Sequence, residues 1–584
     1  MRAGGGPQTA PGRPARRCVR NVHAAAGDTR YFGRMPPRSG KRRERLQAKL
    51  AMSQRRIRDE LFYVRICFRQ GMLGLEPPGR LLRIGRAFWD YGMLGGSITI
   101  AAIRHPNTVA LIDERRQLTY RELEARTNAI ANAWIARGLA PGDGVALLIR
   151  NHGGFLEALL AGAKCGARII LMNTGFSGPQ IREVAEREGT DLLVYDQEYA
   201  AEVGDLPFRL GSYRAWTDDD HDAADTLESL ATGTDPVPPP PKPARPPRLV
   251  ILTSGTTGTP KGAGRDVPFS LAPVGGPLSK VPFRSGDVTQ ISAPMFHALG
   301  FSQALLQVGL GATLVLQRRF DERALLDSVE RHRVTTLILV PVMLQRLVAL
   351  DPAQLRSRDL SSLRIIYLSG SQLGTDLAQR ATSAFGPVLY NLYGSTEITF
   401  ATIATPEDLA AVPGTVGRVV RGAMVKVVDN AGNELPAGQT GRIFVGNIIH
   451  FEGYTGGADK ERLRGMVSSG DVGHFDADGR LFIDGRDDEM IISGGENVFP
   501  AEIEELLCGH PAVLEAAAVG VQDAQFGQRL KVFVVARDGL ELSEEEVKSY
   551  VRDNLARYKV PREVVFMSEL PRNPTGKVLK RDLD

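Results

Sequence analysis

The stretch Leu249–Gly262, LVILTSGTTGTPKG, decides how this chain is interpreted. Its first four residues form an apolar run that is typical of a buried strand. A loop of Thr, Ser and Gly follows and ends at Pro260, Lys261 and Gly262. Glycine lets backbone N–H groups turn toward an anion, hydroxyls add donors and lysine adds charge, so the loop predicts a polyphosphate site. It is not a Walker A loop, because Pro260 stands where that motif needs glycine.

Strand-like and helix-like segments alternate on both sides of this loop, which is typical of βαβ units in a parallel sheet. The last hundred or so residues have a smaller α+β pattern, in which Ser543 and Glu546 form a capping box. We therefore expect an α/β fold with a large N-terminal part on parallel sheets and a smaller α+β C-terminal part. The clearest alternation before the loop pairs the strand-like runs Val145–Ile149, Ala167–Leu171 and Asp191–Tyr195 with the helical runs Gly154–Cys165 and Ile181–Glu188.

The length and composition fit a globular chain with a large core. The 584 residues are 43% hydrophobic and 24% charged, which excludes a wholly disordered chain. No apolar run reaches 18 residues, so we expect no transmembrane span. The four cysteines are far apart and form no Cys-x-x-Cys pair, which argues against a zinc site or a disulfide framework and favours a cytoplasmic location.

The positive charge of the chain is concentrated at its N-terminus. Residues 1–60 hold 16 Lys and Arg against 4 Asp and Glu, whereas the net charge of the whole chain is only +5. We expect this tail to be disordered. It has three interpretations: a transit peptide, an arm for nucleic acid or acidic lipid, or residues upstream of a true start at Met35, Met52 or Met72. The proline-rich segment 236–247 is expected to be an extended, exposed connector.

Five further motifs follow the phosphate loop along the chain. Together with the loop, they form a set of six motifs in a fixed order. The chain resembles the adenylate-forming superfamily of acyl-CoA synthetases, luciferases and adenylation domains, most closely the bacterial fatty acyl-CoA synthetases. The resemblance covers about residues 75–584 and rests on the loop together with PMFHALG (294–300), YGSTE (393–397), SGD (469–471), GRDDEMIISGGEN (485–497) and PRNPTGK (571–577).

The resemblance implies a domain plan. It predicts an N-terminal adenylation domain over residues 75–487, a mobile C-terminal lid over residues 489–584, and a hinge at Asp488. A carboxylic acid attacks the α-phosphate of ATP to give acyl-AMP and pyrophosphate, and coenzyme A then displaces AMP. Both steps bring anions together, so the site needs positive charge and oriented donors.

The resemblance also assigns the nucleotide site. Tyr393 lies against the adenine, Thr396 donates to the α-phosphate and Glu397 binds Mg²⁺, an ion that prefers carboxylate and phosphate oxygens. Asp471 accepts the ribose hydroxyls, with Arg486 beside it. Further nucleotide contacts are expected from the phosphate loop, from the turn near the adenine and from the YGSTE motif: Thr253, Ser254, Gly255, Thr256, Thr257, Gly258, Lys261, Gly370, Ser371, Gly394 and Ser395.

The catalytic and coenzyme A residues are implied in the same way. Lys577 bridges the carboxylate and the α-phosphate as two anions approach. His297 borders the carboxylate and gates the acyl tunnel, whereas a core histidine is the simpler alternative; no partner spacing makes it a metal ligand. The coenzyme A contacts are assigned to glycines that allow close approach and to basic or aromatic residues: Gly494, Gly495, Tyr558, Lys559 and Arg562.

The substrate is expected to be a medium- or long-chain fatty acid. The segments that line the acyl pocket by resemblance, 296–306, 337–344 and 368–372, are mainly apolar and contain no lysine or arginine. An aryl or other carboxylate–CoA ligase is the alternative. A non-enzyme alternative is a nucleic-acid- or membrane-binding protein with a vestigial catalytic fold. We expect no nucleic-acid partner; peripheral membrane contact and the oligomeric state stay open.

Overall fold

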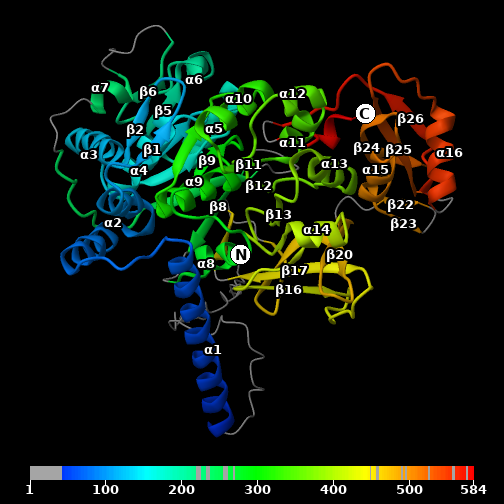
Figure 1. The fold of residues 1–584 in the computed structure, drawn as a ribbon, viewed down its shortest axis with the longest axis horizontal. Helices are drawn as coiled ribbons and strands as arrows, with labels where there is room; N and C mark the ends of the chain where they lie inside the picture. Colours follow the sequence, from blue (N-terminus) through cyan, green and yellow to red (C-terminus); the bar gives the residue numbers. More distant parts are fainter. Residues whose placement is uncertain are drawn as a thin grey trace, which may run out of the picture. The chain divides into compact units, whose positions relative to one another are not determined.

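The computed structural model describes most of the chain from residue 42 onward. Two compact units divide it, Met1–Ser53 and Gln54–Asp584, and the account below concerns the second. Figure 1 shows the labelled elements. The described residues are 42–218, 225–231, 237–253, 261–266, 270–447, 449–454, 460–487, 491–493, 496–523, 527–555, 559–573 and 576–583.

The first large sheet contains the strand that precedes the phosphate loop. Its order is β18-β8-β7-β4-β3-β5-β6, and the five strands from β7 to β6 run parallel to one another. The predicted alternation is confirmed, with bounds that differ from expectation by a few residues at most. The strands are β3 (Gly144–Leu148), β4 (Arg168–Leu171), β5 (Thr190–Asp196), β6 (Ser212–Trp216), β7 (Arg248–Thr253), β8 (Lys261–Asp266) and β18 (His450–Tyr454); α4 (Gly153–Lys164) and α5 (Gly178–Arg187) connect them.

The second large sheet has nine strands in the order β15-β14-β13-β12-β11-β9-β10-β1-β2. The six strands from β13 to β1 run parallel. A buried core joins one face of this sheet to the first sheet, and a second core covers its other face. The strands are β1 (Val109–Ile112), β2 (Gln117–Thr119), β9 (Val288–Ile291), β10 (Thr313–Leu316), β11 (Thr336–Leu339), β12 (Ile365–Leu368), β13 (Leu389–Tyr393), β14 (Thr402–Ala404) and β15 (Arg418–Val419).

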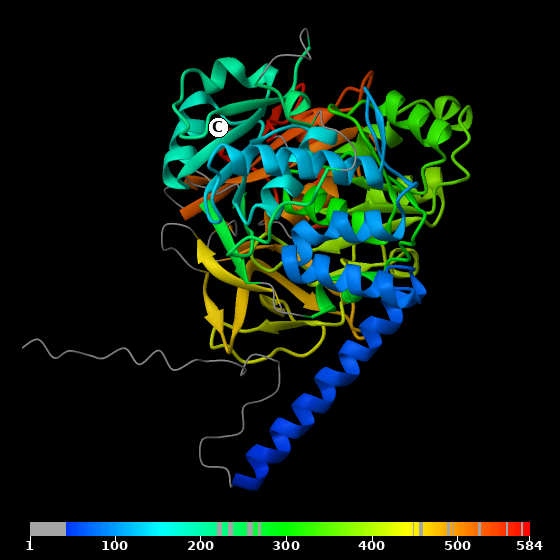
Figure 2. The same ribbon diagram turned by 90° about the vertical axis from the view of Figure 1, so that its left-hand side faces the viewer.

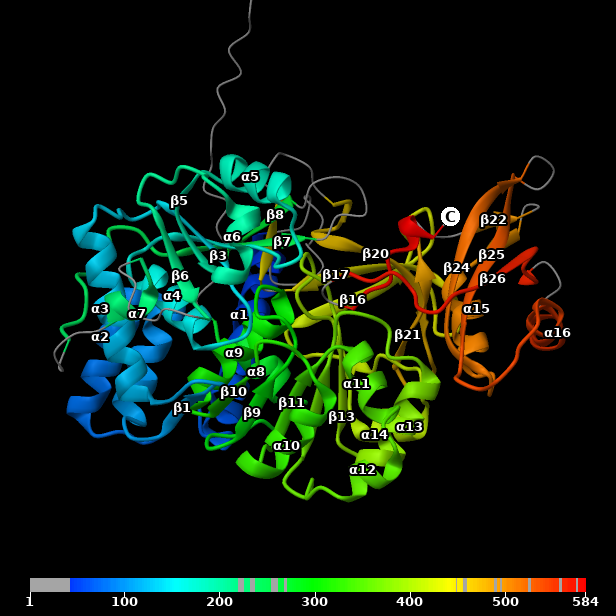
Figure 3. The same cartoon turned by 90° about the horizontal axis from the view of Figure 1, so that it is seen from above.

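Helices follow the strands of the second sheet (Figure 3): α3 leads from β2 to the first sheet, and the others connect parallel strands. Sequence signals fix several helix starts: Thr119 caps α3 and forms a capping box with Glu122. Asp321 caps α10 by accepting from the backbone N–H of Ala324. The helices are α3 (Tyr120–Ala136), α9 (Ala298–Leu310), α10 (Glu322–His332), α11 (Pro341–Val348) and α13 (Thr375–Phe385).

A third, antiparallel sheet completes the large part of the molecule. Figure 2 shows its strands in yellow. Its order is β16-β17-β20-β19, with β21 paired to β20. Alternating inward side chains such as Val425, Val427, Ile443 and Val445 form its core. The strands are β16 (Ala423–Val428), β17 (Gly441–Asn447), β19 (Arg462–Leu463), β20 (Met466–Phe475) and β21 (Leu481–Arg486).

A smaller C-terminal domain follows, orange to red in Figure 1. Its sheet has the order β23-β22-β25-β24 with β26 parallel to β25, and its two helices pack on one shared core. The expected capping box of Ser543 and Glu546 is present. The elements are β22 (Ile491–Ser493), β23 (Glu496–Val498), α15 (Pro500–Cys508), β24 (Val513–Asp523), β25 (Gly527–Ala536), α16 (Glu544–Asn554) and β26 (Glu563–Phe566).

One sequence expectation near the surface is wrong for part of its range, and another holds for most of its residues but not for all. The basic tail was expected to be disordered to residue 60, but helix α1 spans Arg42–Arg69. The segment from Arg42 onward is rich in strong helix formers and lacks Gly and Pro, unlike the residues before it. The proline-rich connector is not wholly exposed, because Pro240 is buried and its carbonyl accepts a hydrogen bond from Tyr91 Oη. The remaining tail residues lie outside the described part of the chain.

Candidate active site

The predicted site gathers at one edge of the nine-stranded sheet. Strands β9, β11, β12 and β13 are parallel neighbours, so their carboxyl ends meet at this edge. The residues that follow them belong to the predicted motifs. Ligand sites in open parallel sheets lie outside such carboxyl ends. The segments concerned are 294–297 after β9, Val340 after β11, Gly370 and Ser371 after β12, and 394–397 after β13.

The YGSTE turn is held by its own hydroxyl. Ser395 Oγ donates to Glu397 Oε2 at 2.7 Å and accepts from the backbone N–H of Glu397 at 3.2 Å. Thr399, two residues on, has φ +60°, a strained backbone conformation for a β-branched residue. Asn447 at the end of β17 stabilises this conformation of Thr399, because Asn447 Nδ2 donates to the carbonyls on both sides of it. These are the Ile398 carbonyl, at 2.7 Å, and the Phe400 carbonyl.

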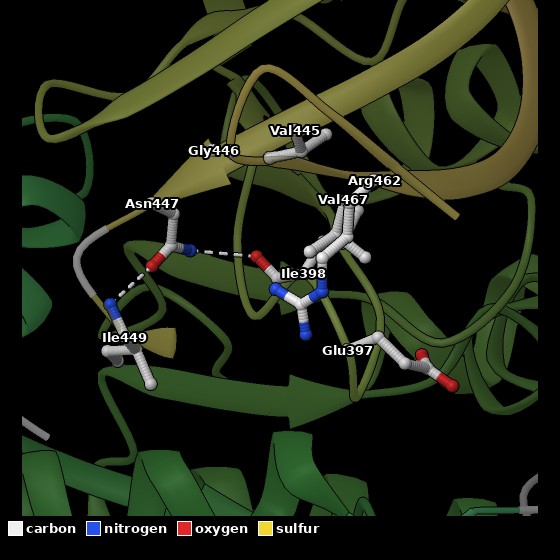
Figure 4. Close-up of a pocket in the computed structure, with 9 residues that line it drawn as sticks. Glu397, Ile398, Val445, Gly446, Asn447, Ile449, Arg462 and Val467 are labelled. Carbon is white, nitrogen blue, oxygen red and sulfur yellow. Dashed lines mark hydrogen bonds between the residues drawn. The ribbon is translucent and has the colours of Figure 1, made fainter. Parts of the chain in front are cut away.

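A hollow lies beside this turn (Figure 4). The Asn447 side chain spans from the Ile398 carbonyl to the N–H of Ile449, whereas the Arg462 side chain reaches down between β17 and the turn. The Glu397 carboxylate points away from Asn447 and is half-buried. The hollow is lined by Glu397, Ile398, Val445, Gly446, Asn447, Ile449, Arg462, Gly465 and Val467.

Tyr393 and Asp471 meet although they are far apart in the sequence. Tyr393 Oη donates to Asp471 Oδ2 at 2.5 Å, and Arg486 Nη1 lies 3.5 Å from Asp471 Oδ1. The antiparallel register of β20 and β21 places Asp471 opposite Arg486. Burial, followed by the nearby Asp471 charge, raises the pKa of Tyr393 well above its usual value, so the phenol stays a donor.

The Asp471 carboxyl is balanced between opposite influences. Burial raises its pKa above the usual value, and this effect dominates. The hydrogen bond from Tyr393 and the charges of Arg486 and Lys577 act in the lowering direction. A carboxylate accepts several hydrogen bonds, so Asp471 keeps acceptor positions beyond the one that Tyr393 uses.

Lys577 lies at the tip of a short hairpin. Asn573 N–H donates to the Lys577 carbonyl and Asn573 Oδ1 accepts from Lys577 N–H, both at 2.9 Å. Gly576 has φ +80°, and a Cβ there would lie 2.1 Å from Val342 Cγ1 of α11. The glycine therefore lets the hairpin sit directly on the helix that follows β11. The Lys577 side chain is exposed.

His297 precedes α9 and is mainly buried. Its ring lies 4.4 Å from the Phe296 ring, centroid to centroid. Among the described residues no group hydrogen-bonds to His297 Nε2, a buried atom. Burial lowers the pKa of His297 to about 4, so the imidazole is neutral at physiological pH. The orphan nitrogen distinguishes it from a satisfied core histidine.

The phosphate loop is described only at its ends. β7 and β8 pair antiparallel, with Thr253 opposite Lys261, so the two ends of the loop are cross-strand neighbours. Residues Ser254–Gly258 lie outside the described part of the chain. The hinge candidate Asp488 and the coenzyme A candidates Gly494, Gly495 and Tyr558 lie outside it as well.

Two of the coenzyme A candidates are described. Lys559 Nζ lies 2.5 Å from Glu502 Oε2 at the start of α15, so it is ion-paired. Arg562 is exposed. No described contact joins Lys559 or Arg562 to the Tyr393–Asp471 pair. Asp487, next to the hinge candidate, accepts from Arg442 Nε at 2.9 Å.

Sequence reasoning missed Asn151 as well as Asn447. Asn151 is buried after β3; its Nδ2 donates to the Ile291 and Ala293 carbonyls, and its Oδ1 accepts from Met295 N–H at 2.9 Å. It therefore ties the first sheet to the turn that leads to His297. The only sequence signal for Asn151 was its position as a polar residue soon after a buried parallel strand, because it belongs to none of the motifs.

The residues present fit a metal ion that arrives with the nucleotide. Within the described part of the chain, no group of three or more His, Cys, Asp or Glu side chains could hold a metal ion. Glu397 instead offers one carboxylate, with hydroxyl residues next to it. Magnesium uses one or two carboxylates together with substrate phosphates and water, so this donor set suits it.

Comparisons with known proteins agree with this geometry. The family model "AMP-binding enzyme" matches residues 99–455, and "AMP-binding enzyme C-terminal domain" matches residues 502–577. The chain is 34% identical over 507 residues to the fatty acid–[acyl-carrier-protein] ligase ScoC of Streptomyces coeruleorubidus, across 82% of this chain and 94% of ScoC. It is also 34% identical over 507 residues to a feruloyl-CoA synthase of Amycolatopsis sp, across 85% and 98% of the two chains.

Solved structures give the same result. The crystal structure of ATP-bound MatB from Rhodopseudomonas palustris is similar with a TM-score of 0.74 and 26% identity, over 84% of this chain and 98% of MatB. Fold and site thus define an adenylate-forming ligase. The chain belongs to the family of AMP-binding enzymes. It is an AMP-forming acid–thiol ligase for acyl or aryl acids, a class that uses ATP, Mg²⁺ and coenzyme A.

No helix among the described residues is long and apolar enough to cross a membrane.

Proposed function

We propose that the protein is an acyl-CoA synthetase whose substrate is a medium- or long-chain fatty acid. The acid and ATP give acyl-AMP and pyrophosphate, and coenzyme A then gives acyl-CoA and AMP. The observation that supports the substrate assignment is the uncharged, mainly apolar segment that follows β9, which we assign to the wall of the acyl pocket; its Phe296, Phe301, Ala304 and Val308 belong to the buried core. A hydrocarbon tail gains from contact with such a wall, because apolar surface leaves water.

The first half-reaction uses the residues at the sheet edge. We assign the phosphates to Thr253–Gly258 and Lys261, and the α-phosphate to Thr396. Gly370, Ser371, Tyr393, Gly394 and Ser395 surround the adenine. When bound through Glu397, Mg²⁺ offsets the charge of the phosphate oxygens.

Asp471 and Arg486 hold the ribose in this assignment. The Tyr393 hydroxyl already occupies Asp471 Oδ2, so the ribose hydroxyls are left the remaining lone pairs of the carboxylate. Since Tyr393 also faces the adenine in this proposal, its hydrogen bond to Asp471 fixes both contacts together.

Lys577 completes the adenylation site. Two anions must approach when the carboxylate attacks the α-phosphate, and a flexible ammonium lowers their repulsion. The packing of the Lys577 hairpin on α11, the helix that follows β11 at the carboxyl edge of the sheet, supports this role.

The second half-reaction requires the lid to move. We infer that residues 75–487 form the adenylation domain and 489–584 the lid, with Asp488 as the hinge. Rotation withdraws Lys577 and opens a thiol path past Gly494 and Gly495, with Tyr558, Lys559 and Arg562 near the coenzyme A nucleotide. To contact coenzyme A, Lys559 must leave its ion pair with Glu502.

His297 borders the substrate carboxylate in this proposal. Its neutral imidazole can donate one hydrogen bond to a carboxylate without adding a fixed charge. Its unpaired Nε2 supports the role, because a buried nitrogen without a partner is costly unless a ligand satisfies it.

An aryl–CoA ligase is the second candidate function. The specific observation in its favour is the 34% identity to a protein named feruloyl-CoA synthase. An aromatic ring also suits an apolar wall, so the wall alone does not separate the two classes.

A panel of acids separates them. Acids from acetate to palmitate, together with benzoates, are assayed by ATP–pyrophosphate exchange and then by thioester formation with coenzyme A. We expect the highest kcat/KM on medium or long chains. Turnover confined to benzoates, with none on octanoate or longer acids, would contradict the proposal.

We further propose a cytoplasmic location and a role in fatty acid metabolism. The described cysteines Cys67, Cys165 and Cys508 are free thiols, which supports a reducing compartment. Peripheral contact with a membrane is proposed on separate evidence below.

A further inference from the structure

Exposed large apolar side chains concentrate in one short segment. Among the described residues ten large hydrophobic side chains are exposed, and eight of them lie between Ile57 and Met93. Three belong to α1, four belong to α2 (Pro78–Arg104) and Leu75 lies between the two helices, whereas Leu540 and Phe566 lie elsewhere. Scattered exposed leucines are ordinary, but a local cluster of this kind marks an interaction site.

The first half of α2 turns its apolar face outward. Leu82 and Trp89 are seven residues apart, so they share one face of the helix, and they are 76% and 75% exposed. Leu81 beside them is also exposed. The opposite face carries Ala87 and Tyr91, which are buried against the protein. A helix docked only on its own protein would show the reverse pattern.

The helix axis breaks directly after this half. Gly92 has non-helical φ/ψ angles of +66° and −164°, and the second half of α2 is buried at Gly95, Gly96 and Ile98. The kink thus separates an anchored half from a half with an exposed apolar face. The face is therefore not a continuation of the core.

Cations border the exposed face. Arg83 is exposed, and the Arg86 side chain is 85% exposed with Asp90 3.3 Å from its Nε. Lys242, far away in the sequence, has its Nζ 4.4 Å from the centre of the Trp89 ring. The hydrogen bond from Tyr91 to the Pro240 carbonyl holds that connector against α2. We define the α2 surface by Leu81, Leu82, Arg83, Arg86, Trp89 and Lys242.

We propose that the α2 surface docks on the surface of an anionic lipid bilayer. Leucine and tryptophan on one helix face, flanked by arginine and lysine, suit the boundary between headgroups and acyl chains. A twofold contact with a second copy is the competing occupant. It would bring two copies of this net positive surface into one interface, which disfavours it. The inference does not depend on the acid that the enzyme uses.

The protein carries its own reporter for the test. Of its three tryptophans, Trp134 and Trp216 are buried and Trp89 is exposed. The full-length protein, without ATP or acid, is titrated with vesicles of phosphatidylcholine and with vesicles of phosphatidylcholine and phosphatidylglycerol. We expect the anionic vesicles to shift Trp89 emission to the blue and to protect it from acrylamide, less so at high salt.

Variants locate the contact. Leu81→Ser with Leu82→Ser keeps the reporter and removes the apolar anchor, so affinity for anionic vesicles should fall about tenfold or more. Arg83→Gln with Arg86→Gln should weaken binding to anionic vesicles selectively. Leu540→Ser with Phe566→Ser is the matched control and should bind like the wild type. Pyrophosphate exchange and circular dichroism check that every variant is folded.

Three results would overturn the proposal. The first is a wild-type protein that does not bind anionic vesicles. The second is a control variant that loses binding as strongly as the Leu81–Leu82 variant. The third is Trp89 emission that shifts with protein concentration in the absence of vesicles, since this would make a second copy the occupant. Because no substrate is present, failure here leaves the acid panel unaffected.

Discussion

At the scale of residues, the account depends most on the carboxylate of Asp471. Asp471→Asn keeps the size of the side chain and an acceptor for Tyr393 but removes the charge that faces the ribose. A hydrogen bond to a charged group contributes about 1.5–3 kcal/mol, so the KM for ATP should rise roughly ten- to a hundredfold. Steady-state pyrophosphate exchange measures this directly.

Asp487→Asn is the control for that substitution. Asp487 lies beside Arg486 but pairs with Arg442. Its replacement should leave the KM for ATP within about twofold of the wild type, in keeping with the small effects of partly exposed ion pairs. An equal rise in both variants would mean that general charge, and not the ribose contact, sets nucleotide affinity.

His297 makes a prediction about pH. Its pKa is lowered to about 4 in the folded protein and is about 6.5 when unfolded. Between these values the unfolded chain binds a proton that the folded protein does not. The stabilising contribution is therefore complete above pH 6.5 and is lost as the pH falls toward 4, by at most about 3 kcal/mol.

The measurement compares thermal midpoints of the wild type and His297→Asn from pH 7 to pH 4. We expect the midpoint of the wild type to fall more steeply, because the other histidines are the same in both proteins. Parallel curves would show that His297 is not a neutral buried imidazole in the folded state. The variant tests the environment of the residue independently of its role toward substrate.

At the scale of elements, the hairpin that carries Lys577 depends on Gly576. Gly576→Ala introduces a Cβ 2.1 Å from Val342 Cγ1 at a φ of +80°. The hairpin must shift on α11, and a displaced catalytic group costs rate steeply, so adenylation should fall about tenfold or more. Adding Val342→Ala should recover part of the loss, because it removes the clashing methyl group.

Gly539→Ala is the matched control in the same domain. Gly539 has φ +76°, and nothing lies within 4 Å of the Cβ that alanine would add. Both alanine variants share the cost of a left-handed conformation, roughly 1 kcal/mol of stability. Only Gly576→Ala should lose adenylation; equal losses would assign the effect to stability alone.

The elements could be predicted from the sequence where local signals decide. Hydrophobic periodicity located β3, α4, β4, α5 and β5, and the capping box of Ser543 and Glu546 located the start of α16. The outward face of α2 could not be predicted, because periodicity shows that a helix has an apolar face but not whether the protein covers it. The helix over the last part of the basic tail was missed because composition was averaged over sixty residues.

The site was predictable only in part. Motifs supplied Tyr393, Asp471 and Lys577 as single residues. Their contacts depend on strands β13 and β20 and on a hairpin near the C-terminus, so sheet packing had to be known first. Asn151 and Asn447 carry no motif at all, and their buried hydrogen bonds become visible only when the carbonyls of distant strands are placed beside them.

At the scale of the whole molecule, the central claim is that one lysine on a mobile lid serves one half-reaction and not the other. The described contacts fit an adenylation arrangement. Thr375 Oγ1 donates to Glu505 Oε1 of α15 at 2.5 Å, and the Lys577 hairpin sits on α11. If the lid turns before coenzyme A reacts, Lys577 leaves the nucleotide during the second step.

The most direct measurement separates the two half-reactions of Lys577→Ala. Pyrophosphate exchange reports the first, and thioester formation from supplied acyl-AMP and coenzyme A reports the second. Lys580→Ala, a nearby lysine paired with Glu504 at 2.8 Å, is the control and should keep both activities. We expect Lys577→Ala to lose adenylation by about a hundredfold or more and to keep thioester formation largely intact. Equal loss of both half-reactions would contradict the account.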